Sequence, residues 1–331
     1  MHPILLHGHT RSLTKIKYNN DGDLLFSASK DNQPNVWFAH NGERLGSYNG
    51  HNGTVWDLDV SFDSTRLLTA SADNTCRMWS VTSGKELFRW NTRTAVRRVA
   101  FGQGDRVALY VTDAVMGQPS TVWIVEIEED VENQTEDFLL KIVIPGSKAT
   151  VAAWGDLNKT IYTGHEDGTI TIWDAETGAK IKSVKNHEKM ITDMQWAPNL
   201  GYFITSSKDH TAKIFDAKTL RVMKTFVTER NVNSAALSPI RPHIALGGGQ
   251  EAMDVTTKGG VKQGKFETRF FHLPFEEEIG RVKGHFGPIN TLAFAPDGKS
   301  FASGAEDGFV RIHFFDPDYF TFKYDEETMT L

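Results

Sequence analysis

The sequence predicts an all-β fold in which seven similar units close into a ring. Three observations lead to this prediction. A set of marker residues recurs at a fixed spacing along the chain, the segments between the markers alternate apolar with polar residues as half-buried strands do, and 331 residues accommodate seven such units. A single domain is therefore expected over residues 1–331, with a short C-terminal tail from about residue 317.

The most regular marker is a histidine that follows glycine or asparagine and recurs four times. These histidines are His9, His51, His187 and His285. An aspartate stands 22 residues after each of them, and an aromatic residue stands 28 residues after each. The aspartates are Asp31, Asp73, Asp209 and Asp307, and the aromatic residues are Trp37, Trp79, Phe215 and His313. Four segments that keep one register over 28 positions indicate a structural repeat.

Three further units fit the pattern in a weaker form. Their markers are Phe101, Asp113 and Trp123 in the third unit, Trp154, Asp167 and Trp173 in the fourth, and Leu237, Gln250 and Phe271 in the sixth. The last marker of each unit then falls at positions 37, 79, 123, 173, 215, 271 and 313. These positions describe seven units on a base period of 42 residues, with insertions in the third, fourth and sixth.

Each unit contains short β-like segments separated by turn signals. TVWDLDV (54–60) and GTITIWD (168–174) alternate apolar with polar residues and are rich in β-branched and aromatic types. Asp-Gly pairs such as Asp167-Gly168 mark the turns. With its Gly-His and Trp-Asp markers and a period near 42 residues, the whole chain resembles the WD40 family. This resemblance implies a seven-bladed WD40 β-propeller.

Closure of the ring is expected to involve the first strand. Only eight residues precede His9, and the last unit lacks a fourth strand of its own. An open ring would expose unpaired strand edges, which invite aggregation. We therefore expect Pro3–His7 to complete the last blade beside Val310–Phe315.

The composition excludes several classes of protein. Hydrophobic residues make up 39% of the chain and charged residues 24%, which is typical of a folded globular protein. The single Cys76 allows neither an intrachain disulfide nor a zinc site of three or four cysteines. A net charge of −6 does not suit a dedicated nucleic-acid binder, so direct contact with nucleic acid is not expected. Without a secretory signal or a long apolar run, we expect a cytoplasmic location and no membrane contact.

The recurring histidines and aspartates invite comparison with a Ser/His/Asp hydrolase, but an active site needs one constellation and this one occurs four times. The WD40 resemblance implies a structural network instead, which joins the histidine, the aspartate, the tryptophan and a strand Ser or Thr two residues before the aspartate. The expected members are His9, Ser29, Asp31 and Trp37 in the first unit, His51, Ser71, Asp73 and Trp79 in the second, His187, Ser207 and Asp209 in the fifth, and His285 and Asp307 in the last.

No other motif predicts chemistry. The segment GGVKQGK (259–265) resembles a phosphate-binding loop, but Phe266 follows it where such a loop needs Ser or Thr to bind magnesium. We therefore expect no catalytic residue, no cofactor and no metal site.

A second resemblance is more specific. The segments 12–31, 41–60, 245–257, 265–272, 275–313 and 319–325 resemble the i-subunit (WD-repeat subunit) family of eukaryotic translation initiation factor three, and GGGQEAMDVTT (247–257) is the most distinctive of them. This resemblance implies a non-enzymatic scaffold subunit that docks the C-terminal helix of the b subunit and the g subunit. It also implies support for the recruitment of initiator tRNA and mRNA to the small ribosomal subunit, and for scanning.

A partner helix is expected to lie across the rim of the fifth and sixth blades, with apolar residues on the strands and basic residues near an aspartate. The expected contacts are Asn199, Ile214 and Asp216. A dedicated homo-oligomer is not expected. Three alternatives stay open: an adaptor in receptor or kinase signalling, a substrate receptor of a ubiquitin ligase, and a propeller enzyme. The proteins that co-purify with the chain distinguish these functions.

Overall fold

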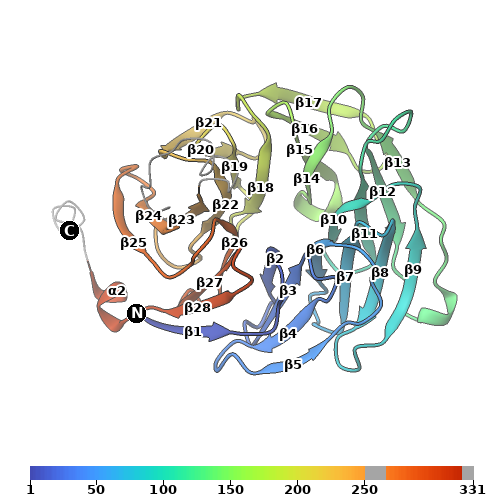
Figure 1. Cartoon of the computed structure of the whole chain (residues 1–331). Coiled ribbons are helices and arrows are strands. Elements are labelled where there is room, and N and C mark those ends of the chain that lie inside the picture. Colours follow the sequence, from blue (N-terminus) through green and yellow to red (C-terminus); the bar gives the residue numbers. More distant parts are fainter. Residues whose placement is uncertain (250–265, 323–331) are drawn as a thin grey trace.

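A computed structural model of the chain describes residues 1–249 and 266–322. In these residues the strands form seven four-stranded antiparallel sheets, which surround a central channel as the blades of a β-propeller (Figure 1). The predicted fold class is therefore confirmed. Gln250, most of GGGQEAMDVTT (247–257), the GGVKQGK segment (259–265) and the end of the 319–325 segment lie outside the described residues.

The first four blades are formed by consecutive strands, named from the channel outward. Blade 1 contains β2 (Leu13–Tyr18), β3 (Leu24–Ser29), β4 (Asn35–Phe38) and β5 (Arg44–Ser47). Blade 2 contains β6 (Val55–Val60), β7 (Arg66–Ser71), β8 (Thr75–Ser80) and β9 (Glu86–Asn91). Blade 3 contains β10 (Val96–Phe101), β11 (Val107–Thr112), β12 (Thr121–Glu126) and β13 (Leu140–Val143). Blade 4 contains β14 (Ala149–Trp154), β15 (Thr160–His165), β16 (Thr169–Asp174) and β17 (Lys180–Lys185).

The remaining blades follow the same plan, except that the last one takes its outer strand from the N-terminus. Blade 5 contains β18 (Ile191–Trp196), β19 (Tyr202–Ser207), β20 (Thr211–Asp216) and β21 (Val222–Val227). Blade 6 contains β22 (Val232–Leu237), β23 (His243–Gly248), β24 (Thr268–His272) and β25 (Glu278–Val282). Blade 7 contains β26 (Ile289–Phe294), β27 (Ser300–Ala305), β28 (Val310–Phe314) and β1 (His2–Leu6). Short helices occur at η1 (Val131–Asn133), η2 (Asp156–Asn158) and α2 (Pro317–Thr321).

The N-terminal strand closes the ring as predicted. β1 pairs antiparallel with β28, so that Ile4 lies opposite Ile312 and Leu6 lies opposite Val310 (Figure 1). Leu6 is buried in the apolar cluster that joins blades 7 and 1, together with Leu13 and other residues of β2. The two ends of the chain are therefore held together by both a hydrogen-bonded strand pair and shared apolar packing.

Apolar side chains fill the space between adjacent blades. One cluster joins Phe26 and Tyr48 of blade 1 to Leu58, Leu67 and Trp79 of blade 2, and six further clusters occupy the other parts of the ring in the described residues. Because each blade has neighbours on both sides, its second and third strands are packed on both faces, whereas the outer strands are largely exposed. The C-terminal helix α2 adds to this packing, since the Tyr319 ring stacks on Phe315 with 3.9 Å between the ring centroids.

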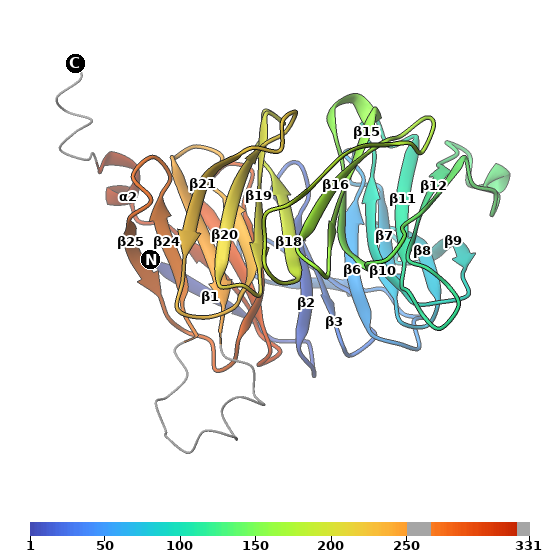
Figure 2. The ribbon, with the colours of Figure 1, turned by 90° about the horizontal axis from the view of Figure 1, so that it is seen from above.

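The connections between strands alternate between two faces of the ring because neighbouring strands are antiparallel. The loops that enter the inner strands share one face with the turns between second and third strands, and we call it the histidine face because the four marker histidines lie there. The other turns share the opposite face, which we call the turn face. Figure 2 views the ring from its edge, with the strands running between the two faces. Among the described residues, no helix has the length and hydropathy to cross a membrane.

Candidate functional sites

The histidine network is clearest in blade 2. His51 Nδ1 lies 2.7 Å from the Asp73 carboxylate, and His51 Nε2 lies 2.7 Å from Thr69 Oγ1. Trp79 Nε1 donates to the same Thr69 oxygen at 2.8 Å. A neutral imidazole satisfies every group, because Nδ1–H donates to the aspartate and Nε2 accepts the threonine hydroxyl, whose oxygen accepts the indole N–H. The network therefore fastens the loop, two strands and the turn of one blade together.

Three other blades repeat this geometry. In blade 1, His9 lies 2.8 Å from Asp31 and 2.7 Å from Ser27, to which Trp37 donates at 2.8 Å. In blade 5, His187 lies 2.8 Å from both Asp209 and Thr205, with Phe215 at the tryptophan position. In blade 7, His285 lies 3.0 Å from Asp307 and 2.8 Å from Ser303, with His313 at the tryptophan position.

In blades 1, 2 and 5 the hydroxyl at the centre of the network is not the predicted one, and in blade 7, where none was predicted, a hydroxyl is present. The residues predicted for this role, Ser29, Ser71 and Ser207, instead donate to a loop carbonyl, as Ser71 does to Gly53 O at 3.1 Å, and accept the aspartate N–H. The central hydroxyls belong to Ser27, Thr69, Thr205 and Ser303. The aspartate bonds Nδ1 of the histidine, so Nε2 on the far side of the ring points to the hydroxyl that lies two residues earlier in the strand than the predicted serine. Each central hydroxyl stands 18 residues after its histidine, a spacing that is readable in the sequence.

The glycine before the histidine allows the loop to lie against the indole. A Cβ on Gly8 would stand 2.7 Å from Trp37 Cη2, and a Cβ on Gly50 would stand 3.1 Å from Trp79 Cη2. Blade 5 has Asn186 at this position and Phe215, which lacks the second ring, in place of the tryptophan. The two substitutions in blade 5 are therefore sterically consistent with each other.

These networks are enclosed within the blades. The hydroxyl-bearing side chains of Ser27, Thr69, Thr205 and Ser303 are completely buried, so no substrate reaches them. Burial by itself raises the pKa of Asp73, but the hydrogen bonds from His51 and Thr75 outweigh it and hold that pKa well below its usual range. The same balance lowers the pKa of Asp209 through His187 and Thr211. The aspartates thus stay ionised as fixed acceptors for the network.

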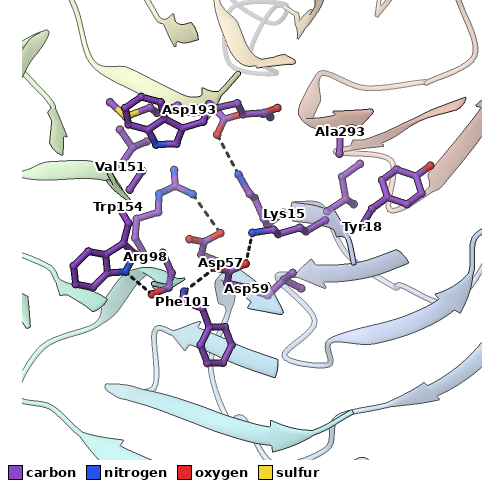
Figure 3. Close-up of a pocket in the computed structure, with 18 of the residues that line it drawn as sticks. Lys15, Tyr18, Asp57, Asp59, Arg98, Phe101, Val151, Trp154, Asp193 and Ala293 are labelled. Carbon is purple, nitrogen blue, oxygen red and sulfur yellow. Dashed lines mark hydrogen bonds and ion pairs between the residues drawn. The ribbon is translucent and has the colours of Figure 1, made fainter. Parts of the chain in front are cut away.

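The central channel contains paired charges from several blades (Figure 3). A cavity of about 480 Å³ lies here, and Lys15 Nζ is 3.1 Å from Asp193 within it. Lys17 pairs with Asp59, and Arg98 lies 3.8 Å from Asp57. Burial raises the pKa of Asp57, although Arg98 and Lys15 oppose that effect. Among residues 1–249 and 266–322, no three His, Cys, Asp or Glu side chains are grouped as a metal ion requires.

The three predicted contact residues on blade 5 have different surroundings. Asn199 is exposed in the turn between β18 and β19, and Asp216 ends β20 on the same turn face. Ala217 N donates to Gly201 O at 3.0 Å, so these two turns touch. Asp216 Oδ1 accepts the Thr219 N–H at 2.7 Å and the Thr219 hydroxyl at 2.6 Å. These bonds lower the pKa of Asp216.

Ile214 does not belong to an exposed contact surface. Its side chain is 1% exposed and lies in the apolar cluster between blades 5 and 6. β20 is packed on both faces, so the alternation of its residues does not distinguish inward from outward positions. This part of the predicted contact is therefore corrected.

Exposed apolar residues occur instead at a repeated bulge in the outer strands. The pairing of the third and fourth strands skips one residue of the outer strand in blades 1, 2, 4, 5 and 6. The skipped residue of blade 2, Leu87, is partly buried against an apolar cluster. The skipped residues of the other four blades are Leu45, Ile181, Met223 and Ile279, which are 47%, 56%, 48% and 39% exposed. Met223 and Ile279 are on neighbouring blades, and Asp216 ends β20, the strand that pairs with the strand of Met223. We define Asn199, Asp216, Met223 and Ile279 as the blade 5–6 rim. Sequence alternation alone gave no signal for these bulges.

Comparison with known proteins gives matches over nearly the whole chain. The EIF3I family model matches residues 1–325. A protein of Bombyx mori named eukaryotic translation initiation factor 3 subunit I is 53% identical over 328 residues, which cover 98% of this chain and 99% of that protein. The Homo sapiens protein of the same name is 52% identical over 325 residues, covering 98% of this chain and 100% of its own length. The Nematostella vectensis protein is 50% identical over 319 residues, or 96% and 98% of the two chains.

Proposed function

The chain belongs to the eukaryotic translation initiation factor 3 subunit I family, and from this premise we propose that it is a non-enzymatic docking subunit of the initiation factor 3 complex in the cytoplasm. In this role it holds the C-terminal helix of the b subunit and part of the g subunit. Through the complex it supports recruitment of initiator tRNA and mRNA to the small ribosomal subunit, and scanning. The observation that supports docking most directly is the blade 5–6 rim, which presents exposed apolar side chains of two adjacent blades and an acidic group.

The rim suits an amphipathic helix. Met223 and Ile279 are at equivalent bulges of adjacent blades, so a helix that crosses the two outer strands meets two apolar anchors. The Asp216 carboxylate is at the surface and is kept ionised by its bonds to Thr219. It is therefore placed to pair with a basic residue on the flank of that helix.

The rigidity of the rim also supports a docking role. Lys224 Nζ donates to Pro274 O at 2.8 Å and pairs with Glu276 at 2.9 Å, which ties β21 to the turn before β25. The two blades are thus held in one relative position across the proposed contact. A preformed surface loses little conformational freedom when a partner binds.

The test compares two aspartates with identical local roles. Asp174 in blade 4 accepts the Thr177 N–H and hydroxyl, each at 2.7 Å, as Asp216 accepts those of Thr219. Asp216→Arg should weaken capture of a C-terminal fragment of the b subunit by about tenfold, whereas Asp174→Arg should leave capture unchanged. The measurement is binding of the purified full chain to the immobilised fragment, with melting temperature as the check on folding.

Equal effects of the two substitutions would remove the blade 5–6 rim as the docking site. Purification of the native complex with identification of its proteins tests the wider assignment. Initiation-factor subunits are expected, and recovery of a signalling receptor or a cullin adaptor in their place would contradict it.

A further inference from the structure

All seven inner strands contain a bulge at the same position. The pairing of each inner strand with the second strand skips one residue, and that residue faces the channel mouth on the histidine face. The seven bulged residues are Thr14, Trp56, Arg97, Thr150, Thr192, Asn233 and Asn290. Together they line a cavity of about 600 Å³ at this mouth. The bulges therefore form a ring of side chains at one end of the channel.

Five members of the ring connect one blade to the next. Thr150 donates to Ile191 O at 2.6 Å, Thr192 donates to Val232 O at 2.7 Å, and Thr14 donates to Val55 O at 2.5 Å. Asn233 and Asn290 do the same to Ile289 O and Leu13 O, at 3.1 and 3.0 Å. In every case the acceptor is the residue just before the next bulge. A small polar residue at this place thus stabilises the joint between blades.

Trp56 and Arg97 depart from this pattern, and they are neighbours in blades 2 and 3. Neither donates to the next blade from its bulge. The Arg97 guanidinium lies over the Trp56 ring, 4.2 Å from the centroid, and both Nε and Nη2 are 2.9 Å from Asp113. The hydrogen bond from blade 3 to blade 4 comes from the residue after Arg97, because Arg98 Nε donates to Thr150 O at 2.6 Å. Arg97 therefore does not form the hydrogen bond to the next blade that its counterparts form.

Trp56 destabilises the fold through an unpaired hydrogen-bond donor. Its indole N–H is buried and has no acceptor among the described residues. A buried donor without a partner costs roughly 1–3 kcal/mol, and a threonine at this place would avoid that cost. The exchange of a bridging threonine for a stacked Trp–Arg pair weakens the joint, which points to a role in binding.

The charge at this mouth differs from that of the whole chain. Five cationic side chains, including Lys30, Lys148 and Arg97, and three anionic ones line the cavity, whereas the chain as a whole has a net charge of −6. The Arg97 side chain is 36% exposed, so a ligand can reach the part of the guanidinium that Asp113 does not hold. A concave, cation-rich mouth in an acidic protein attracts an anionic segment.

We infer that the channel mouth on the histidine face binds an extended acidic peptide segment of a partner protein, with a carboxylate of that segment at Arg97 and its backbone against the Trp56–Arg97 pair. A peptide fits better than a nucleic acid for two reasons. Arg97 covers the Trp56 face on which a base would stack, and Glu166 and Glu306 at the same mouth repel a continuous run of phosphates. This site is separate from the blade 5–6 rim, so its test is independent of the proposed function.

The ring itself supplies the variant for the test. Trp56→Thr/Arg97→Thr gives both blades the residue found at Thr14, Thr150 and Thr192, so the fold should be kept and the melting temperature should stay within about 2 °C. The probe is a fluorescein-labelled (Asp-Gly)6 peptide, followed by fluorescence anisotropy with the full chain at low salt. The wild type should bind the probe, and the double variant should bind it about tenfold more weakly. Lys85→Thr, which removes one exposed charge from the turn face, should bind as the wild type does.

Several results would overturn the inference. They are no binding of (Asp-Gly)6 by the wild type, equal binding by the double variant, and tighter binding of a ten-nucleotide oligouridylate with the same dependence on Trp56. If the double variant loses cooperative melting, Arg97→Glu tests the same contact without altering Trp56. It should weaken binding of the acidic probe by about tenfold and strengthen binding of a (Lys-Gly)6 probe.

Discussion

Four blades carry the histidine network and three do not, yet all seven have the same four strands in the described residues. Blades 1, 2, 5 and 7 anchor the entering loop through a histidine five residues before the bulged residue. Blades 3 and 6 have Thr92 and Thr228 at that place. The hydroxyl of Thr92 lies 2.8 Å from Asn74 O and 2.7 Å from Thr94 O, and that of Thr228 lies 3.0 Å from His210 O and 2.6 Å from Arg230 O.

Blade 4 uses a third solution. Pro145 stands at the histidine place, and the imidazole comes from His165 on β15. His165 Nε2 lies 3.0 Å from Thr163 Oγ1, and Trp173 donates to the same oxygen at 2.8 Å. The indole and the hydroxyl of the network are thus kept while the loop histidine is lost. The comparison teaches that the blade backbone requires a fixed loop, and that the residue which fixes it is interchangeable.

The largest expected difference between the two kinds of blade is in stability. His51→Ala removes two hydrogen bonds, leaves Thr69 and Asp73 buried with fewer partners, and opens a cavity, so it should lower the free energy of unfolding by about 4 kcal/mol. Thr228→Ala removes one hydroxyl that contacts two backbone carbonyls, and it should lower the free energy of unfolding by about 1 kcal/mol. Urea unfolding of the two variants measures both values. Similar losses in the two variants would show that the histidine is no stronger an anchor than the threonine.

The sequence predicted the number of blades and the closing strand because both follow from the regular spacing of the marker residues along the whole chain. It misassigned Ser29 because Ser27 and Ser29 point to the same side of β3 and only the reach of the His9 ring distinguishes them. The bulged residues Trp56 and Met223 were beyond prediction, since a bulge is defined by hydrogen-bond pairing and not by residue type. Sequence repetition thus predicts the repeated elements well, whereas the residues that depart from the repeat are recognised only from the strand pairing in the structure.

The next expected effect distinguishes the blades by pH. In blade 7, His313 replaces the tryptophan and stacks on Phe301, with 4.7 Å between centroids. Burial, and then the nearby His285 and Arg311 side chains, lower the pKa of His313 to about 4. The unfolded chain takes up this proton near pH 6.5, so the unfolded state binds more protons between pH 6.5 and 4 and stability falls as the pH is lowered through that window. The aspartates of blades 2 and 5, with lowered pKa values, lose their contribution only below about pH 3.8.

His313→Phe should therefore reduce the loss of stability between pH 7.5 and 4.5 by about 2 kcal/mol after allowance for partial solvent screening. The measurement is the urea midpoint at the two pH values. His40→Gln, which removes an exposed histidine, is the control and should behave as the wild type. An unchanged pH dependence in His313→Phe would mean that this histidine does not stay neutral in the fold.

The smallest expected effect is a coupling inside blade 5, where Asn186 and Phe215 replace the glycine and tryptophan of blades 1 and 2. Phe215→Trp alone supplies an indole N–H for Thr205, but its second ring would meet the Asn186 side chain, as a Cβ on Gly8 would meet Trp37. Steric overlap and the new hydrogen bond oppose each other, so the single variant should be less stable than the wild type by about 1 kcal/mol.

Adding Asn186→Gly removes the overlap and leaves the hydrogen bond. The double variant should therefore regain about 1 kcal/mol relative to Phe215→Trp, although Asn186→Gly alone gives no gain because the smaller phenylalanine leaves room for the asparagine. The four proteins form a double-mutant cycle that urea unfolding measures. Additive effects would show that the glycine before the histidine serves only the backbone of the loop. A coupling of the expected sign would show that the tryptophan requires a glycine before the histidine for steric reasons, and that Asn186 and Phe215 in blade 5 compensate for each other.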